Sequence, residues 1–399
     1  MNASSPLKLA AVGGRRARSF DGVFSLLADQ VELTAICDLD PEELARWRML
    51  HPAVQTFARY EEMLERADCD AVFVTTPLPL HAAQSIQALA AGKHVLSEVT
   101  AIRTLDEGYA LIEAVERSGR TYMLAENYCY TRPNRLVLSL ARQGLFGDLI
   151  YAEGAYIHDC RALLLGPNNE LTWRGLYRRD MNGNSYPTHS LGPVAQWLDI
   201  NRSDRLVSTA TWMTREDAMT RYIAERLGGD HPMAQPGYFQ HGDSATTVIS
   251  TERGALIVLR VDWASPRPHN MTHYVLQGSR GAYLSERYHG EDPLIWIDGR
   301  SRGASPPDPV RGEAEWEPLW NYAAEFEDEG WRTLGAEARR AGHGGGDYFV
   351  IRDFVEAVRN GTPPPIDVYD AVTWSAIVPL SEESVRRGGA PVEVPKFTR

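Results

Sequence analysis

The stretch Leu7–Phe20, LKLAAVGGRRARSF, decides the fold of this 399-residue chain. Its first part, Leu7–Val12, is an apolar run broken by one lysine, which is typical of a parallel strand buried on both faces. Gly13 and Gly14 follow directly and open a turn into a polar segment. A buried strand followed at once by a glycine turn predicts the start of a doubly wound α/β sheet.

Four more apolar runs follow this strand before residue 126, and amphipathic segments lie between several of them. Strands that alternate with helices of about 10 to 15 residues indicate βαβ units and a parallel sheet. We therefore predict an α/β domain over residues 1–126, with a doubly wound parallel sheet. Its further strands are expected at Val31–Cys37, Ala71–Thr75, Lys93–Ser97 and Thr121–Ala125.

The pattern changes after Glu126, where strand-like stretches follow one another with Gly and Pro turns between several of them. Consecutive strands without intervening helices predict a mostly antiparallel sheet. We therefore expect residues 127–399 to form an α+β domain. Its strands are predicted near Leu149–Ile157, Leu206–Trp212, Ser244–Ser250, Ala255–Asp262 and Thr272–Gln277.

Composition excludes several classes of protein. The formal net charge is −12 and no basic cluster is present, which argues against nucleic-acid binding. No apolar run is long enough to span a bilayer. The N-terminus lacks a signal-peptide pattern, so we expect a cytoplasmic protein unless an export signal was removed. The four cysteines form no CxxC pair and are expected to be buried free thiols: Cys37, Cys69, Cys129 and Cys160.

The turn after the first strand partly matches a dinucleotide-binding fingerprint. Gly13 fits the GxGxxG pattern, but Arg15 and Arg18 stand at the other two glycine positions. Asp38 follows the second strand 25 residues later, near the spacing expected for a carboxylate on a ribose hydroxyl. A carboxylate there repels a 2′-phosphate, so NAD is favoured over NADP, although the arginines keep NADP open. The alternative interpretation of Asp38 is a helix N-cap.

Polar residues also follow the later strands of the predicted parallel sheet. Ligands of such sheets bind beyond the carboxyl ends of the strands. We therefore expect further cofactor contacts from Thr75, Thr76, Pro77, His81, Glu98 and Asn127. For His81, capping of the helix start is the alternative.

Two longer stretches carry a family resemblance. They are TTPLPLHAAQSIQALAAGKHVLSEV over Thr75–Val99 and AENYCY over Ala125–Tyr130. Both resemble the Gfo/Idh/MocA oxidoreductases. The resemblance implies an N-terminal Rossmann domain and a C-terminal domain with a large open sheet, and it makes a homodimer the default expectation.

The chain departs from the usual dehydrogenases of this superfamily at two points. Those enzymes carry Glu-Lys-Pro after the fourth strand, where this chain has Glu98, Val99 and Thr100. They also pair an aspartate with a later histidine, whereas here Ser185 precedes His189 at that spacing. The chain has three lysines, and none stands where it could replace the missing one: Lys8, Lys93 and Lys396.

The same departures are found in glycoside hydrolase family 109. The segment Gly183–His189, GNSYPTH, resembles that family's Gly-Asn-x-Tyr-Pro-Thr-His motif. The similarity extends to Gly144–Asp159, Trp173-Arg174, His343–Gly345 and Val368–Ser381. It implies a retaining glycosidase, similar to α-N-acetylgalactosaminidases, that uses NAD+ without net redox change and acts through a 3-keto sugar.

The resemblance also implies residue roles. His189 is the candidate for the C3 hydroxyl, because imidazole titrates near neutral pH. Tyr186 is expected to share that hydroxyl, and Tyr130 to act at C2, with Tyr128 and Tyr156 as alternatives. Substrate contacts are expected from Trp173, Arg174, His269 and His343. His158-Asp159 has no third ligand at suitable spacing, so we expect no metal site.

Two other functions stay open on the sequence. A sugar or cyclitol dehydrogenase could use Tyr186 with His189 as its acid–base pair. A catalytically silent sugar or dinucleotide sensor would account for the degenerate glycine turn. In all three cases the expected partner is a small carbohydrate, with neither nucleic acid nor membrane involved.

Overall fold

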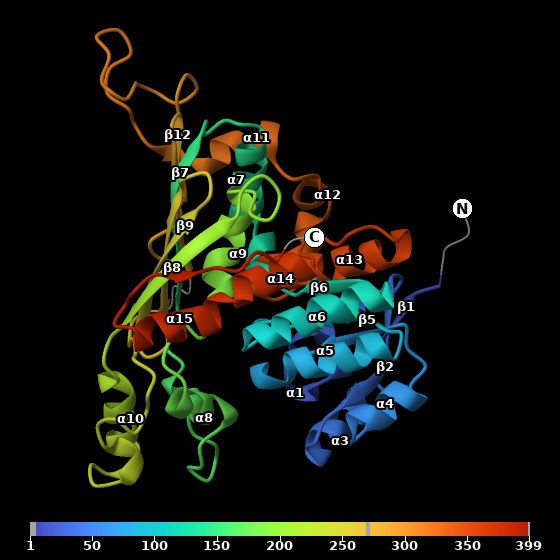
Figure 1. Ribbon diagram of the computed structural model, residues 1–399. Helices are drawn as coiled ribbons and strands as arrows, with labels where there is room; N and C mark the ends of the chain where they lie inside the picture. Colours follow the sequence, from blue (N-terminus) through green and yellow to red (C-terminus); the bar gives the residue numbers. More distant parts are fainter. Residues whose placement is uncertain (1–4, 269–271, 398–399) are drawn as a thin grey trace. The chain divides into compact units, whose positions relative to one another are not determined.

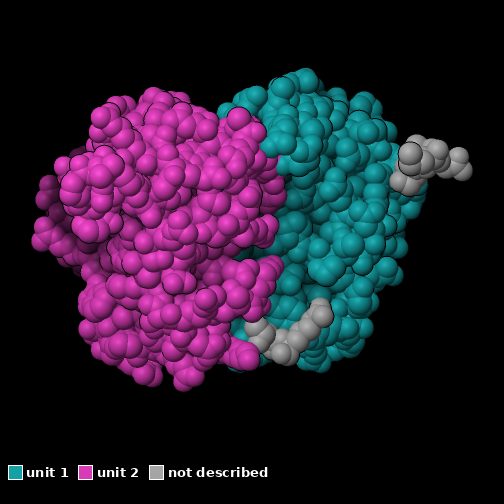
Figure 2. Space-filling model, turned by 90° about the horizontal axis from the view of Figure 1, so that it is seen from above, with its two compact units in different colours: residues 1–132, 329–376, 397–399 teal, residues 133–328, 377–396 magenta. Residues whose placement is uncertain are grey.

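The computed structural model describes residues 5–268 and 272–397, and its contacts divide the chain into two compact units. Unit 1 holds residues 1–132, 329–376 and 397–399, and unit 2 holds residues 133–328 and 377–396 (Figure 2). The sequence placed a boundary after residue 126 and assigned all later residues to a second domain. The contacts instead group the segment 329–376 with the N-terminal unit.

Unit 1 is built on a six-stranded sheet in the order β3-β2-β1-β4-β5-β6, with every pair parallel. Figure 1 labels its strands β1, β2, β5 and β6. The order reverses between β1 and β4, which is the switch point where ligands of such sheets bind. The predicted doubly wound parallel sheet is therefore confirmed. Its strands are β1 Leu7–Val12, β2 Val31–Cys37, β3 Gln55–Phe57, β4 Ala71–Val74, β5 His94–Ser97 and β6 Tyr122–Leu124.

The helices of unit 1 begin where the sequence supplies caps. Asp40 accepts a hydrogen bond from Glu42 N at 2.9 Å and Pro41 follows, which starts α3. Thr104 and Glu107 form a capping box at α6. The main helices are α2 Asp21–Leu26, α3 Pro41–Leu50, α4 Tyr60–Arg66, α5 His81–Ala90, α6 Leu105–Ser118, α12 Glu329–Ala338, α13 Gly346–Asn360 and α14 Val368–Ser375.

Strand β3 was missed by the sequence analysis. It has only three residues and lies at the sheet edge beside β2. Three residues are too few to display the alternation or apolar run by which strands are recognised. Only the neighbouring backbone of β2 defines it.

Unit 2 is built on a nine-stranded sheet in the order β14-β13-β12-β11-β7-β10-β9-β8-β15. Only β7 and β10 pair in parallel, so the prediction of a mostly antiparallel sheet is confirmed. The strands β13 and β14 extend the sheet and were not among the strands predicted from the sequence. The strands are β7 Leu149–Ile157, β8 Leu206–Met213, β9 Ser244–Thr251, β10 Leu256–Asp262, β11 Thr272–Gly278, β12 Gly281–Leu284, β13 Leu294–Ile297, β14 Glu317–Pro318 and β15 Val392–Glu393.

Helix α9, Thr188–Trp197, packs closely against β7. A Cβ at Gly154 would lie 2.0 Å from the backbone oxygen of Ser190, so only glycine allows this approach. Tyr274, the cross-strand neighbour of Gly154, donates from its hydroxyl to the oxygen of His189 at 2.6 Å. The other helices of this unit are α7 Arg132–Arg142, α8 Trp173–Asp180, α10 Asp217–Leu227, α11 Ala323–Phe326 and α15 Ile377–Arg386.

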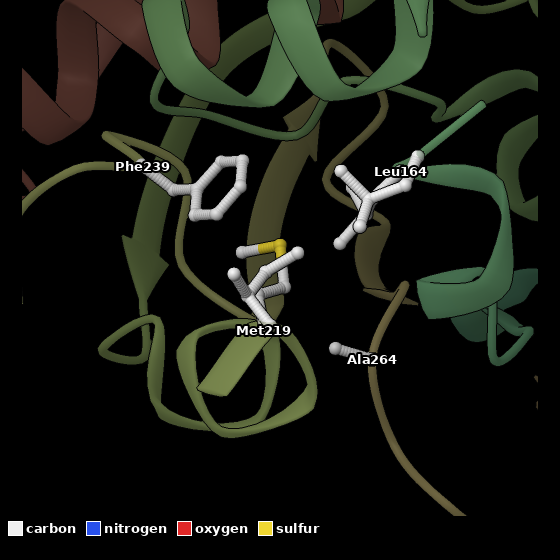
Figure 3. Close-up of a cluster of buried hydrophobic side chains, with 6 residues drawn as sticks. Leu164, Met219, Phe239 and Ala264 are labelled. Carbon is white, nitrogen blue, oxygen red and sulfur yellow. The ribbon is translucent and has the colours of Figure 1, made fainter. Parts of the chain in front are cut away.

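A separate apolar cluster packs helix α10 into unit 2. Phe239 and Leu164 lie on either side of Met219 from α10, and Ala264 lies nearby (Figure 3). All four side chains are buried, so this cluster fixes the loops around α8 and α10 to the sheet. Within the described residues, every helix is too short or too polar to cross a membrane.

The close packing of α9 on β7 makes a testable prediction. Gly154→Ala is expected to destabilise the protein by about 2 kcal/mol, because the new methyl group must displace the backbone of Ser190. Calorimetric unfolding measures the change. Gly229→Ala, in the same unit with open space around it, is the control and should change stability by less than about 0.5 kcal/mol. Equal melting temperatures for the two variants would contradict the packing described here.

Candidate active site

The turn after β1 is held in a conformation that requires glycine. Gly13 has φ +98°, and a Cβ there would lie 2.5 Å from Thr75 O. The Thr75 hydroxyl lies 2.8 Å from both Val12 O and Gly13 O and donates to these carbonyls. Thr75 thus fixes the turn at the switch point, where β1 pairs with β4.

Asp38 follows β2 and lies beside this turn. Its Oδ1 accepts from Asp40 N at 2.9 Å, and its Oδ2 accepts from Arg15 N at 3.3 Å. The N-cap of α3 is Asp40 rather than Asp38, so the alternative interpretation of Asp38 as that cap is wrong. The Asp38 carboxylate is left at the carboxyl end of the sheet, as a ribose contact requires.

Two of the turn's three arginines are engaged by carboxylates of unit 1. Arg16 pairs with buried Glu98 at 2.6 Å, and Arg18 pairs with buried Glu43 at 3.4 Å. Arg15 is exposed and reaches Asp40 at only 4.0 Å. Glu98, predicted as a cofactor contact, therefore also anchors the turn that follows β1.

His81 is buried and both its ring nitrogens face backbone carbonyls. Nδ1 lies 2.9 Å from Thr100 O, and Nε2 lies 2.8 Å from Thr76 O. Burial lowers the pKa of His81, and a neutral imidazole donates to only one of the two carbonyls. His81 thus ties the loop after β4, with Thr76 and Pro77, to the loop after β5.

A chain of polar side chains follows β6. Asn127 Nδ2 donates to Asp347 Oδ1 at 2.9 Å, and Asp347 Oδ2 lies 2.9 Å from His343 Nδ1. The oxygen of the same amide, Asn127 Oδ1, is buried without a partner among the described residues. The ring of Tyr128 meets the ring of His343 edge-on at 5.9 Å. The sequence did not identify Asp347, which joins two of its predicted site residues.

Tyr130, the predicted C2 base, is 1% exposed in unit 1. Its backbone oxygen accepts from Trp331 Nε1 at 2.8 Å, which joins α12 to the segment after β6. The structure therefore gives Tyr130 a clear part in packing. Its predicted role at C2 stays a prediction.

In unit 2, two tyrosine rings pack against His189, and each of them contacts a further aromatic ring. The His189 ring lies 4.7 Å from Tyr156 and 5.0 Å from Tyr186, between ring centroids. Tyr186 also meets Trp263 edge-on at 5.3 Å. The hydroxyl of Tyr156 lies 3.0 Å from His158 Nδ1. The structure thus brings the predicted pair Tyr186 and His189 together, and it adds Tyr156, which the sequence ranked below Tyr130.

Helix α8 carries the predicted pair Trp173 and Arg174. The Arg174 guanidinium lies over the Trp173 ring at 4.4 Å from its centroid. One turn later, Arg178 is buried and donates to Ser185 Oγ and to His241 Nε2. The sequence analysis missed Arg178 and His241. Arg174 and Arg178 are spaced i, i+4 on α8, and residues at that spacing lie on one face of a helix. This repeat could have indicated Arg178 from the sequence.

Two lysines lie away from this end of the unit 1 sheet. Lys8 is near the start of β1 and pairs with Asp68, and Lys93 precedes β5 and donates to Cys69 O at 2.7 Å. The predicted cofactor residues follow the opposite ends of these strands. Neither lysine can therefore take the place that Val99 holds after β5. His269, another predicted substrate contact, lies outside the described residues.

Comparison with family models gives two matches that together cover nearly the whole chain. Residues 7–126 match the oxidoreductase family with an NAD-binding Rossmann fold. Residues 130–399 match the C-terminal domain of glycosyl hydrolase 109. Residues 7–126 are thus an NAD-binding domain, and NAD is its cofactor.

Two relatives are similar to this chain over most of their length. A glycosyl hydrolase family 109 protein of Stenotrophomonas maltophilia is 35% identical over 93% of this chain and 84% of its own. An α-N-acetylgalactosaminidase of Tannerella forsythia is 33% identical over 92% of this chain and 82% of its own.

Among solved structures, a levoglucosan dehydrogenase with NADH and L-sorbose superposes with a TM-score of 0.77. It is 20% identical and the match covers 98% of this chain and 99% of that one. A WlbA dehydrogenase of Bordetella pertussis with NADH and UDP-GlcNAcA gives a TM-score of 0.71 at 17% identity, over 99% of each chain. At these identities the similarity establishes the fold.

The glycine turn makes the first prediction about the site. Gly13→Ala is expected to weaken NAD+ binding by at least about ten-fold, because a left-handed non-glycine residue is strained and its methyl meets Thr75 O. Titration calorimetry with NAD+ measures this. Gly22→Ala, in the same unit with nothing within 4 Å, should bind NAD+ as the unaltered protein does. Unchanged affinity in Gly13→Ala would contradict the assignment.

The Asp347–His343 pair predicts a pH dependence. Burial lowers the pKa of His343, but the hydrogen bond and charge of Asp347 outweigh burial, so the pKa is raised above 6.5. The pair therefore stabilises the fold fully below pH 6.5, and this stabilisation is lost as pH rises through the folded-state pKa. Asp347→Asn should lower that pKa, as followed by NMR titration of the ring protons. A pKa unchanged by the substitution would contradict the pairing.

Proposed function

The chain belongs to glycosyl hydrolase family 109, and from that premise we propose that it hydrolyses glycosides with NAD+ as a recycled cofactor. The observation that carries the proposal is the cluster of His189, Tyr186 and Tyr156 in unit 2. It supplies hydroxyl and imidazole groups for proton transfer to a sugar. At the same time, Val99 stands after β5 where a dehydrogenase of this superfamily has its lysine.

The residues of unit 1 fit NAD. The turn at Gly13 leaves no room for a Cβ, because the backbone of Thr75 and Thr76 packs against it, and the turn therefore stays tight beside the switch point. Asp38 would hold a ribose hydroxyl. The buried Oδ1 of Asn127 has no donor among the described residues, and a cofactor amide or hydroxyl could supply one. When bound, NAD+ supplies a reversible hydride acceptor for C3 of the sugar.

The residues of unit 2 would then transfer the protons of the sugar. We assign His189 to the C3 hydroxyl, whose proton its imidazole takes and later returns. A ketone at C3 acidifies the C2 proton, and loss of that proton expels the aglycone from C1. Water then adds at C1, C2 regains a proton, and the C3 carbonyl regains its hydride, so that hydrolysis is completed with no net redox change. This scheme needs no pair of carboxylates at fixed separation, unlike most glycosidases.

Tyr156 is the proposed base at C2, with Tyr130 as the alternative. Tyr156 is buried against His189 and its hydroxyl contacts His158, so a proton can pass to a second imidazole. Tyr186 would share the C3 hydroxyl with His189. Trp173 and Arg174 would hold the sugar, and His343 is a further proposed substrate contact.

The substrate we propose is an α-linked N-acetylgalactosaminide or a closely related sugar. The support is the Tannerella forsythia relative, which carries that activity in its name. A panel of nitrophenyl α- and β-glycosides, assayed with no cofactor added, tests sugar and anomer together. Mass spectrometry of the denatured protein identifies any nucleotide carried through purification.

Two outcomes separate the proposed function from a sugar dehydrogenase. Hydrolysis in D2O should place deuterium at C2 of the product, because the C2 proton exchanges with solvent in the elimination. Hydrolysis without deuterium at C2 would overturn the mechanism. Accumulation of NADH with a free sugar, and no release of nitrophenol, would identify a dehydrogenase instead.

The roles in unit 2 predict specific losses. His189→Ala is expected to lower kcat by at least about 10²-fold while NAD+ binding is kept, because a positioned general base contributes that much. Tyr156→Phe should abolish C2 exchange, whereas Tyr130→Phe should leave it. Stopped-flow NADH absorbance and C2 exchange are the readouts. The reverse pattern in the two tyrosine variants would transfer the C2 role to Tyr130.

A further inference from the structure

Arg178 is a buried cation without a counter-charge among the described residues. Its exposed fraction is 3%, and it forms no ion pair with a carboxylate in residues 5–268 or 272–397. Burial lowers its pKa to about 9, so the guanidinium still carries its charge at neutral pH. A buried, unpaired charge is unfavourable, and proteins ordinarily pair it or bind an ion of opposite sign there.

The contacts of Arg178 use only part of its hydrogen-bonding capacity. Nη1 donates to Ser185 Oγ and to His241 Nε2, while His241 Nδ1 donates to Gly242 O. His241 is therefore a neutral acceptor, and burial followed by the charge of Arg178 lowers its pKa well below 6.5. The Nε and Nη2 groups of Arg178 have no acceptor among the described residues, which leaves a side of the guanidinium available.

A small cavity lies beside this guanidinium. It is lined by Cys160, Arg161, Leu164, Arg174, Arg178, Met219 and Trp263. The space open to the centre of a water-sized group is about 10 Å³, which holds about one such group. Leu164 and Met219, which also belong to the apolar cluster of Figure 3, form its non-polar wall.

The lining of the cavity carries positive charge and no negative charge. Arg161 is neutralised by Asp159, at 2.8 Å. Arg174 lies over Trp173 and, like Arg178, has no carboxylate partner among the described residues. Burial raises the pKa of the Cys160 thiol to about 12, so the thiol is neutral at pH 7. The cavity beside these two guanidinium groups, which have no carboxylate partner in the part of the chain that the structure describes, thus favours an anion.

We propose that this cavity binds a small anion, of the size of one halide ion or one carboxylate oxygen, on the free N–H groups of Arg178. Arg174 lies on the same wall and adds a second positive charge. Trp263, whose ring lies 4.0 Å from the Arg178 guanidinium and 5.3 Å from the Tyr186 ring, contacts both the anion site and the proposed sugar site.

The anion has two sources with the same chemistry. It is either a free halide, or an acidic group carried by the substrate. The second source rests on the proposed glycosidase function and would make acidic sugars part of the substrate range. The first does not depend on that function, so binding of a free ion can be tested on the purified protein alone.

The direct experiment is diffraction from crystals soaked in bromide, recorded at the bromine absorption edge. We expect an anomalous peak within hydrogen-bonding distance of Arg178 Nε or Nη2. Absence of a peak at Arg178, when other bromide sites are occupied, would overturn the proposal. The measurement uses the unaltered protein, so it does not depend on whether a variant folds.

Variants give the second test. Titration with chloride at constant ionic strength should show binding at least about ten-fold weaker in Arg178→Met, because a charge-assisted hydrogen bond is lost. Arg161→Lys keeps a cation of the same cavity beside Asp159, and it should bind chloride as the unaltered protein does. Arg178→Lys keeps the charge and should retain part of the affinity. Equal affinity in Arg178→Met and Arg161→Lys would overturn the assignment to Arg178.

Kinetics distinguish the two sources once binding is established. A substrate-borne anion predicts that chloride inhibits hydrolysis of a nitrophenyl galacturonide competitively and leaves a neutral glycoside unaffected. A free ion predicts that chloride changes turnover of the neutral glycoside, and that Arg178→Met removes this dependence. An inactive protein that still binds bromide at Arg178 would refute the glycosidase function and retain the anion site.

Discussion

The contact between helix α9 and strand β7 is the constraint on which the candidate acid–base cluster depends. Gly154 has no side chain, so the backbone of Ser190 can lie against the strand. Tyr156 is on the same face of β7, two residues further along, and His189 directly precedes Ser190. The close approach therefore brings the imidazole against the phenol ring. A larger residue at 154 would move the helix, and with it the candidate base.

The two units stabilise their buried charged side chains in different ways. In unit 1 the buried carboxylates of Glu98 and Asp347 face an arginine and a histidine. In unit 2 the buried guanidinium of Arg178 faces a serine, a neutral histidine and an indole ring. The carboxylates of unit 1 thus have cationic partners within the protein. The Arg178 guanidinium of unit 2 instead has N–H groups left to donate to a bound anion. This difference is why the anion site is inferred in unit 2.

The residues that depart from the dehydrogenase pattern have structural consequences of their own. Ser185, which stands where an aspartate would pair with the histidine, accepts a hydrogen bond from Arg178 and contacts His241. The segment that carries Tyr186 and His189 is therefore fixed to α8 by a neutral hydroxyl. An aspartate at 185 would neutralise Arg178 and remove the reason for an anion in the cavity. The departure that argues against a conventional dehydrogenase thus also creates the unpaired cation.

The sequence by itself determined the two kinds of sheet, the switch point with Gly13 and Asp38, and the pairing of Tyr186 with His189 on one short segment. These follow from local rules: apolar runs, caps, and spacing along one strand or one turn. Tertiary structure decided what lies far apart in the chain. Asp347 reaches Asn127, and His241 reaches Arg178, only because folding brings separate strands and helices together. The sequence did not favour Tyr156 over Tyr130, since both follow or lie on strands. The proposal of Tyr156 at C2 rests on its ring contact with His189, where α9 packs on β7. Hydrophobic periodicity in the sequence indicates which face of a helix or strand a residue occupies. It does not indicate which residue from a distant part of the chain packs against it.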